Sequence, residues 1–188
     1  KKYNLKNTIL IGIIGRLTKI KNHKLFIDIA YELLNSNKKN IKFFIIGDGE
    51  EKNNLVYYCK KLNLITNLNK KTKTQNVNIF FTSWIKRIDQ VYPALDIVIN
   101  TSYNEGTPLS IIEAMASKKT VVATNVGGVG DLITEGYNEF LFNLKEKKKI
   151  VKKINYLIRN KKLRKTIGEN SFNSIKKKYS YKLLVNNI

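Results

Sequence analysis

The sequence has very few of the residues on which several common protein chemistries depend. It contains one cysteine and one histidine in 188 residues. Cys59 alone cannot form an internal disulfide, which fits a reducing compartment and excludes a cysteine-based metal site. His23 has no second histidine with which to share a metal ion, so we interpret it as structural or peripheral to any site. No metal-binding motif such as Asp-x-Asp is present, and the sequence predicts no metal site.

Long apolar runs and acidic residues are also scarce. No apolar run reaches the roughly 20 residues that a membrane-spanning helix needs. Lys and Arg number 35 against 14 Asp and Glu, a formal net charge of +21. We weigh three interpretations of this charge: compositional bias towards Lys, Asn and Ile, a basic face attracted to anionic lipid, and nucleic-acid binding. The third ranks last because no basic stripe interleaved with aromatic residues accompanies the charge. We expect a cytoplasmic location, at the inner face of the membrane if the second interpretation holds, and no nucleic-acid partner.

Apolar segments alternate with helical patterns along most of the chain. The first, Thr8 to Gly15, is a continuous apolar run of the kind that is buried on both faces of a parallel sheet. A helical stripe through Leu25, Ile29 and Leu33 follows it. The expected strands are 8–15, 41–47, 77–82, 96–100, 120–124 and 140–142. The sequence therefore predicts one α/β domain with a doubly wound, parallel, Rossmann-like sheet of about six strands.

The stretch from Asn104 to Ser117 is the most informative part of the chain. It follows the expected strand 96–100 and reads Asn-Glu-Gly-Thr-Pro-Leu-Ser-Ile-Ile-Glu-Ala-Met-Ala-Ser. We predict Thr107 as the N-cap of a helix and Pro108 as its first residue, because proline has a helical φ and no N–H to satisfy. The three N–H groups that follow Pro108 would then be free donors at the positive end of a helix dipole, which is an anion site. Gly106 would let a ligand approach the backbone closely.

Two carboxylates flank this predicted anion site, Glu105 in the loop and Glu113 in the helix. Neither can neutralise an anion, so cations must come from another part of the chain. Ligands of open α/β sheets bind outside the carboxyl ends of the strands, where the loop after the first strand also lies. That loop holds Arg16, Lys19 and Lys21. We therefore expect its cations to balance the charge of a bound anion.

These two loops carry a resemblance to a known family. Residues 105–116 resemble the Glu-x7-Glu motif of retaining, nucleotide-sugar-dependent glycosyltransferases of the GT-B fold, the group-1 (family-4) class. Gly15-Arg16-Leu17, followed by Lys21-Asn22-His23, is similar to the family's Gly-Arg-Leu…Lys-Gly segment, with Asn22 where the family often has Gly. The similarity runs from about Ile9 to about Phe142. It implies that the chain is the C-terminal, donor-binding half of such an enzyme.

The resemblance implies a role for each matching residue. Arg16 and Lys21 would hold the donor diphosphate, Glu105 would lie beside the transferred sugar, and Glu113 would accept hydrogen bonds from ribose hydroxyls. The segment 83–86 would meet the nucleobase, with Ser83 in place of the usual Gly. The residues predicted as catalytic are Arg16, Lys21 and Glu105. Those predicted to bind substrate are Gly15, Trp84, Ile85, Gly106, Thr107, Pro108, Leu109 and Glu113.

Two further turns match the family. Gly47-Asp48-Gly49 resembles its second strand-to-helix loop near the donor. Residues 125–131 resemble its Gly-Gly-x-x-Glu turn, with Asp in place of Glu, whose backbone lines the sugar and phosphate side. The resemblance also divides the chain into a nucleotide-sugar-binding domain, 1–165, and a C-terminal helix, 166–188. This helix would pack towards an N-terminal acceptor domain that this chain lacks.

The implied activity is retaining transfer of a sugar from a UDP- or GDP-linked donor to a glycan or lipid-linked acceptor, in cell-surface glycan or glycolipid synthesis. No cofactor is implied, and side-chain cations would take the place of a metal ion. Three alternatives stay open. One is another GT-B enzyme, such as a sugar-nucleotide epimerase or hydrolase. Another is a nicotinamide-binding domain, although residues 12–17 lack the third glycine of the dinucleotide fingerprint. The last is a basic nucleic-acid-binding module.

Overall fold

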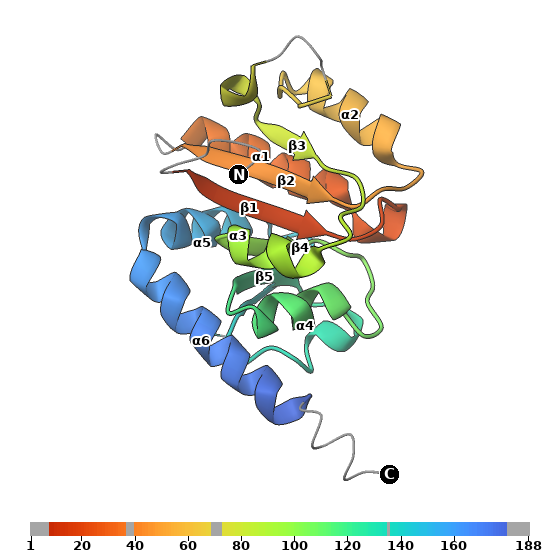
Figure 1. The fold of residues 1–188 in the computed structure, drawn as a ribbon. Helices are drawn as coiled ribbons and strands as arrows, with labels where there is room; N and C mark the ends of the chain where they lie inside the picture. Colours follow the sequence, from red (N-terminus) through yellow and green to blue (C-terminus); the bar gives the residue numbers. More distant parts are fainter. Residues whose placement is uncertain (1–7, 37–39, 69–72, 135, 180–188) are drawn as a thin grey trace.

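A parallel sheet forms the centre of the protein, which a computed structural model describes over residues 8–36, 40–68, 73–134 and 136–179. Its strands are β1 (Ile9–Ile14), β2 (Ile41–Ile46), β3 (Ile79–Phe81), β4 (Ile97–Asn100), β5 (Thr120–Thr124) and β6 (Phe140–Phe142). They are ordered β3-β2-β1-β4-β5-β6 in a 6-stranded sheet, and each neighbouring pair is parallel (Figure 1). The doubly wound sheet predicted from the sequence is confirmed, and each strand end lies within two residues of its prediction.

Helices cover both faces of the sheet. They are α1 (His23–Ser36), α2 (Lys52–Lys61), α3 (Val91–Ala94), α4 (Leu109–Ala116), α5 (Lys147–Arg159) and α6 (Lys161–Lys178). Helices α1, α2 and α5 pack on one face, and α3 and α4 pack on the other. Helix α6 passes from one face to the other, because its Ile167 lies in the first core and its Ile175 in the second. None of the helices in the described ranges is long and apolar enough to cross a membrane.

The expected division after residue 165 falls inside α6, which begins at Lys161. Residues 180–188 of the predicted C-terminal segment lie outside the described residues. The packing of this segment towards an acceptor domain stays a prediction.

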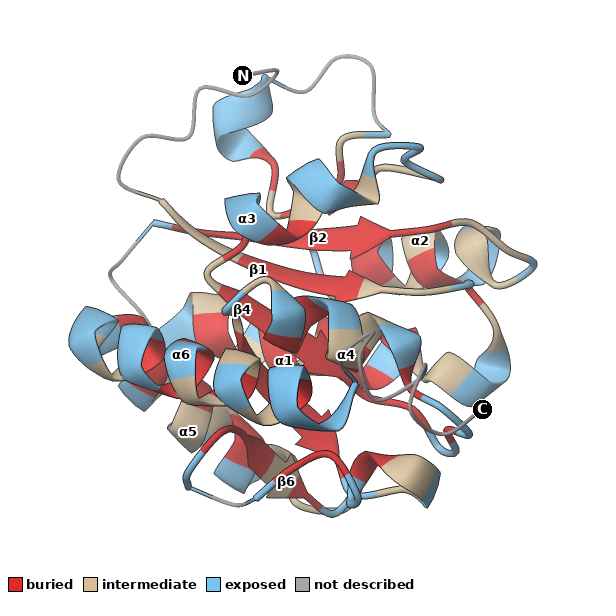
Figure 2. Cartoon of the chain, turned by 60° about the horizontal axis from the view of Figure 1, so that its bottom comes forward, coloured by how far each residue is buried: buried red, intermediate tan, exposed pale blue. Residues whose placement is uncertain are grey.

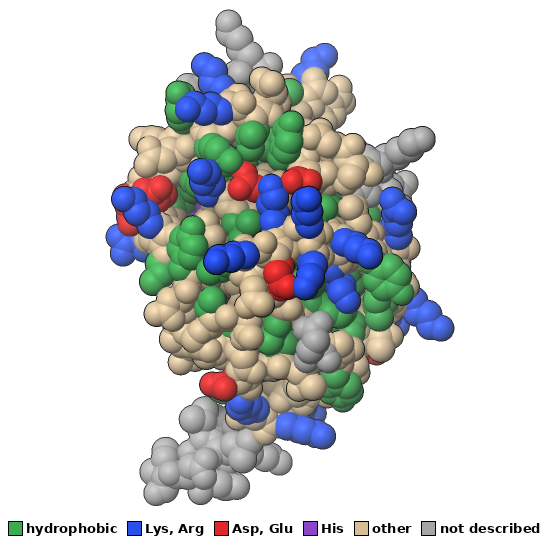
Figure 3. Space-filling view, turned by 180° about the vertical axis from the view of Figure 1, so that it is seen from behind, with side chains coloured by type: hydrophobic (Ala, Val, Ile, Leu, Met, Phe, Trp, Pro, Cys, Tyr) green, Lys and Arg blue, Asp and Glu red, His purple; other side chains and the backbone are tan. Residues whose placement is uncertain are grey.

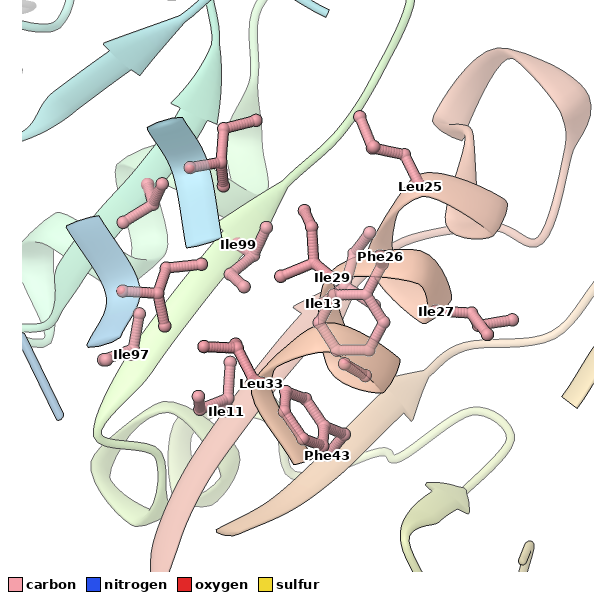
Figure 4. Packing of buried hydrophobic residues seen from close by; sticks show 14 of the residues in the cluster. Ile11, Ile13, Leu25, Phe26, Ile27, Ile29, Leu33, Phe43, Ile97 and Ile99 are labelled. Carbon is pink, nitrogen blue, oxygen red and sulfur yellow. The ribbon is translucent and has the colours of Figure 1, made fainter. Parts of the chain in front are cut away.

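Both faces of the sheet are apolar because successive residues of a strand point to opposite sides. Ile11 and Ile13 of β1 belong to the core beneath α1 and α5, whereas Leu10 and Ile14 pack against the core beneath α3 and α4. Figure 2 shows the central strands as buried, between helices whose outer surfaces are exposed. Figure 4 shows the first core, where α1 side chains meet those of the strands. The continuous apolar runs of the sequence are thus explained by two-sided burial.

A buried arginine joins the two C-terminal helices to the sheet. Arg164 of α6 is 8 % exposed, and its Nη1 donates to the carbonyls of Leu157 (2.6 Å) and Ile158 (3.2 Å) at the end of α5. Its Nη2 lies 3.3 Å from Oδ1 of Asp96, whose Oδ2 accepts the Leu10 N–H at 3.0 Å. Arg164 therefore links the last carbonyls of α5 and a carboxylate beside β1 to α6.

Replacing this arginine should destabilise the fold. Arg164→Met keeps much of the apolar stem but removes the hydrogen bonds to two carbonyls and the contact with Asp96, and losing hydrogen bonds from a charged group should cost about 1.5–3 kcal/mol. Urea denaturation would measure the loss, with Arg159→Met as the matched control, because Arg159 is exposed on α5. Equal effects of the two substitutions would contradict the anchoring role of Arg164.

Candidate functional site

A cavity of about 450 Å³ opens at the carboxyl edge of the sheet. The strand order reverses between β1 and β4, and ligands of such sheets bind at this switch point. Nine of the eleven predicted site residues line the cavity, namely Gly15, Arg16, Lys21, Trp84, Ile85, Glu105, Thr107, Leu109 and Glu113. Ile14, Ile46, Ile88 and Ser110 complete its lining. The other two predicted residues, Gly106 and Pro108, belong to the same loop but are not part of the lining.

Glu105 is a buried carboxylate at this cavity, with 7 % of its surface exposed. Lys21 Nζ donates to both of its oxygens, at 2.7 Å to Oε1 and 2.8 Å to Oε2. Asn100 Nδ2 (2.9 Å) and Ser102 Oγ (2.6 Å) also donate to Oε1. Burial raises the pKa of Glu105, but hydrogen bonds from Lys21, Ser102 and Asn100 outweigh it, so the pKa lies below its ordinary value. Glu105 is therefore ionised near neutral pH.

The two predicted cations are held very differently. The ammonium of Lys21 has three N–H donors, and Glu105 takes two contacts from it, which leaves one donor for another ligand. The side chain of Arg16 is 69 % exposed, and its contact with Glu50 is long, at 3.7 Å. An exposed pair of this kind contributes little stability. Arg16 is therefore the cation of the cavity that can turn towards a bound anion at low cost.

The start of α4 differs from the prediction by one residue. Pro108 occupies the N-cap position with φ −79° and ψ 76°, the helix begins at Leu109, and no side chain caps it. The expected roles of Thr107 as N-cap and Pro108 as first helical residue were wrong, because the ψ of Pro108 is not helical. The N–H groups of Leu109 and Ile111 donate to the carbonyls of Thr107 and Pro108, both at 2.9 Å. Within the described chain, the Ser110 N–H is the donor of this turn that has no backbone acceptor.

The second carboxylate, Glu113, is exposed at the cavity and is oriented by a tyrosine that the sequence analysis missed. Tyr92 is 1 % exposed, and its hydroxyl donates to Oε2 of Glu113 at 2.7 Å. Burial, followed by the hydrogen bond to Glu113, raises the pKa of Tyr92. Tyr92 lies on α3, and no local motif links it to α4. Asn100 and Ser102 were also missed, although both lie at the carboxyl end of β4, at the predicted ligand edge.

The segment predicted to meet a nucleobase is held by a serine in an unusual backbone conformation. Ser83 has φ +58°, in the left-handed region that favours glycine. Its hydroxyl donates to Asp48, which also accepts from Lys52 Nζ and the Gly49 N–H, both at 2.9 Å. These bonds, that of Ser83 first, lower the pKa of Asp48 to about 2. The neighbouring Trp84 is 64 % exposed and lines the cavity, so it does not pack in the core.

The glycine turn after β5 supports the Glu105 loop from behind. Gly127 has φ +50°, and a Cβ there would lie 1.9 Å from the carbonyl oxygen of Glu105. The N–H of Gly128 donates to the same oxygen at 3.0 Å. This turn was expected to line the sugar and phosphate side, but none of its residues lines the cavity. Its glycines are required by the close approach of two backbones.

Comparison of the chain with known proteins assigns it to a family. Residues 1–174 match the family described as glycosyl transferases group 1. The chain belongs to this family. The family resemblance inferred from the Glu105 and Arg16 loops is therefore confirmed.

Three similar proteins illustrate the relationship between this group 1 domain and complete enzymes. The capsular polysaccharide biosynthesis glycosyltransferase CapM of Staphylococcus aureus is 27% identical over 98% of this chain and 46% of its own length. The C-terminal domain of the group 1 protein LpcC from Francisella tularensis is 29% identical with a TM-score of 0.77, covering 92% of this chain and 87% of that one. The structure of a TarM mutant from S. aureus, in complex with Fondaparinux, alpha-GlcNAc-glycerol and UDP, is 26% identical with a TM-score of 0.82 over 99% of this chain and 36% of that one. The chain spans less than half the length of the curated relatives it matches first.

The group 1 domain also buries its histidine without a hydrogen-bond partner. His23, at the start of α1, is 1 % exposed, and neither ring nitrogen has a partner within the described residues. Burial and, to a smaller degree, the charge of Lys21 lower the pKa of His23 to about 4. His23 is therefore neutral near pH 7.

This histidine should make the stability of the domain sensitive to mild acid. Because the pKa of His23 is about 4 in the fold and about 6.5 in the unfolded chain, the unfolded chain binds the proton first. Burial of neutral His23 therefore causes no pH-dependent loss of stability above pH 6.5. As the pH falls from 6.5 towards 4, protonation of the unfolded chain lowers the free energy of unfolding by up to about 3 kcal/mol. Denaturation at several pH values should show a steeper loss for the unaltered domain than for His23→Gln. Parallel curves would refute the prediction.

Proposed function

We propose that this chain is the donor-binding half of a glycosyltransferase, and that its cavity binds a nucleoside-diphosphate sugar. One observation carries the proposal: a single cavity at the switch point of the sheet brings together Arg16, Lys21, Glu105 and Glu113. Family membership supports it, as does the similarity to a TarM structure that contains UDP. The relationship to CapM supports a role in cell-surface polysaccharide or glycolipid synthesis.

The diphosphate would lie between the loop after β1 and the start of α4. Arg16 would turn from its weak contact with Glu50, and Lys21 would supply its remaining N–H donor. The Ser110 N–H and the positive end of the α4 dipole add two further attractions for an anion. These groups are in place before the reaction, so they would stabilise charge that grows on the departing diphosphate without a metal ion. Transfer with retention of configuration is part of the proposal.

The two carboxylates would bind different hydroxyl groups of the donor. Tyr92 donates to Oε2 of Glu113, which leaves Oε1 for a ribose hydroxyl. Oε1 of Glu105 accepts from three donors, whereas Oε2 accepts only from Lys21 within the described residues. Oε2 therefore has the capacity to accept a hydroxyl of the transferred sugar. The buried Glu105 would lie beside the sugar, and the exposed Glu113 beside the ribose.

The nucleobase end of the cavity favours uracil over guanine. Its walls there are apolar and aromatic, from Trp84, Ile85 and Ile88. The carboxylates that line the cavity, Glu105 and Glu113, already accept hydrogen bonds from Lys21 and Tyr92. Guanine presents adjacent N–H donors, for which a carboxylate is the best acceptor, and among the described residues no carboxylate of the cavity lining is left for this role. We therefore propose a UDP-linked donor.

The acceptor would be a glycan or a lipid-linked glycan, bound by an N-terminal domain outside this chain. The chain covers 46% of CapM, which leaves room in the complete enzyme for such a domain. The isolated chain should therefore bind donor but transfer no sugar. Release of free sugar from a UDP-sugar by this chain would instead support the hydrolase alternative.

Removing Arg16 should weaken binding of the diphosphate. A hydrogen bond to a charged group contributes about 1.5–3 kcal/mol, so Arg16→Ala should bind UDP roughly 10- to 100-fold more weakly. Calorimetric titration with UDP in the presence of a chelator would measure this and the independence from metal together. Arg159→Ala is the control, because this arginine is exposed on α5 and does not line the cavity. Unchanged affinity of a folded Arg16→Ala chain, or binding that the chelator abolishes, would refute the proposed site.

Substitutions of the two glutamates should have different effects on the binding of UDP and of UDP-glucose. Glu113→Gln should weaken both ligands by similar factors, because both contain the ribose. Glu105→Gln should weaken mainly UDP-glucose, and it should also destabilise the fold by about 1–3 kcal/mol, because its amide loses an acceptor for buried donors. Titration of each variant with each ligand, together with urea denaturation, tests both parts. Equal losses for both ligands in both variants would show that the assignment of roles is wrong.

A further inference from the structure

Positive charge is concentrated in one segment of the chain. Residues 145–165 contain eleven of the 35 Lys and Arg residues but only one of the 14 Asp and Glu residues. The rest of the chain holds 24 basic and 13 acidic residues. A uniform compositional bias would place about four basic residues in a segment of this length, so the enrichment in Lys and Arg is local. The segment forms α5 and the first turns of α6.

The helices turn this charge outwards. Along α5, Lys148, Lys152, Tyr156 and Arg159 follow one another at helical spacing, and all are exposed. The opposite side of α5 is buried in the core through Ile150, Ile154, Leu157 and Ile158. The outward side chains of this region, which we call the α5–α6 basic face, are Lys148, Lys149, Lys152, Tyr156, Arg159, Lys161, Lys162 and Lys165.

Few carboxylates neutralise this face. Lys149 contacts Glu146 at 2.5 Å, and the other Lys and Arg residues of the α5–α6 basic face form no ion pair within the described part of the chain. Figure 3 views the molecule from the side of α1 and α5, and shows Lys and Arg side chains spread across this side with fewer Asp and Glu side chains among them. The donor cavity, by contrast, is lined by two cations and two carboxylates. The excess charge of the protein is therefore not explained by donor binding.

We propose that the α5–α6 basic face docks on an anionic membrane surface. Its cations are lysines except for Arg159, and lysine acts as a mobile point charge, without the planar fork that arginine offers to fixed phosphates. Such a field fits the mobile headgroups of anionic lipids, which contribute about 1 kcal/mol per basic residue near the surface. Nucleic acid fits less well, because Tyr156 is the one aromatic residue of the face and offers no series of stacking platforms. Tyr156, amphipathic and 56 % exposed, suits the headgroup region.

Vesicle co-sedimentation tests the proposal directly. The chain should bind vesicles that contain phosphatidylglycerol in phosphatidylcholine, release them at high salt, and ignore vesicles of phosphatidylcholine alone. A variant with Lys148→Gln, Lys152→Gln, Lys162→Gln and Lys165→Gln should bind the anionic vesicles at least roughly tenfold more weakly.

The matched control is a variant with Lys60→Gln, Lys61→Gln, Lys73→Gln and Lys177→Gln. It loses the same charge from exposed lysines outside the face and should bind the vesicles nearly as well as the unaltered chain. Both variants should bind UDP like the unaltered chain, since none of these residues lines the cavity. Absence of vesicle binding, equal losses in both variants, or tighter binding to a single-stranded RNA than to the vesicles would each overturn the proposal.

Discussion

A partly buried ion pair across the switch point of the sheet is the interaction on which the candidate site depends. Lys21 comes from the loop after β1 and Glu105 from the loop after β4, and their contact joins the two loops that form the cavity. The surrounding bonds reinforce this junction, because Thr101 Oγ1 donates to the Lys21 carbonyl at 3.1 Å, and the Tyr103 N–H to the Ile20 carbonyl at 2.8 Å. Taking two charges out of water costs about as much as their attraction returns, so the pair fixes geometry more than it adds stability.

This pair also determines how charge is distributed in the cavity. Because Lys21 faces an ionised Glu105, its charge is already balanced, and Arg16 becomes the cation with most freedom to meet a phosphate. The walls around it are fixed by contacts between backbones. A Cβ on Gly47 would lie 2.0 Å from the carbonyl oxygen of Gly15, and one on Gly127 would lie 1.9 Å from that of Glu105. The loops are therefore held before a ligand arrives, which lowers the entropic cost of binding.

The cavity and the outer side of α5 differ in their charge. Two cations and two carboxylates line the cavity, which suits a ligand with both phosphates and hydroxyl groups. The outer side of α5 carries cations almost alone, which suits a surface of one charge. One domain can carry both the cavity and this basic surface, because α5 packs on the sheet through its isoleucines and leaves its lysines exposed. The total charge of +21 thus describes the exposed surface and says little about the site.

The sequence by itself determined the sheet, because two-sided burial requires uninterrupted apolar runs. It also located most of the residues that line the cavity, because ligand loops follow the strands directly. Only the tertiary structure decided which donors those loops share. Lys21 and Glu105 are separated by 84 residues, and Tyr92 and Glu113 by 21, so no local periodicity records either pairing. The start of α4 was misplaced by one residue because its sequence is compatible with a helix from Pro108, whereas the observed turn sets ψ there to 76°. Which side chains pair depends on the order in which the strands lie side by side, and that order exists only once the whole sheet has formed.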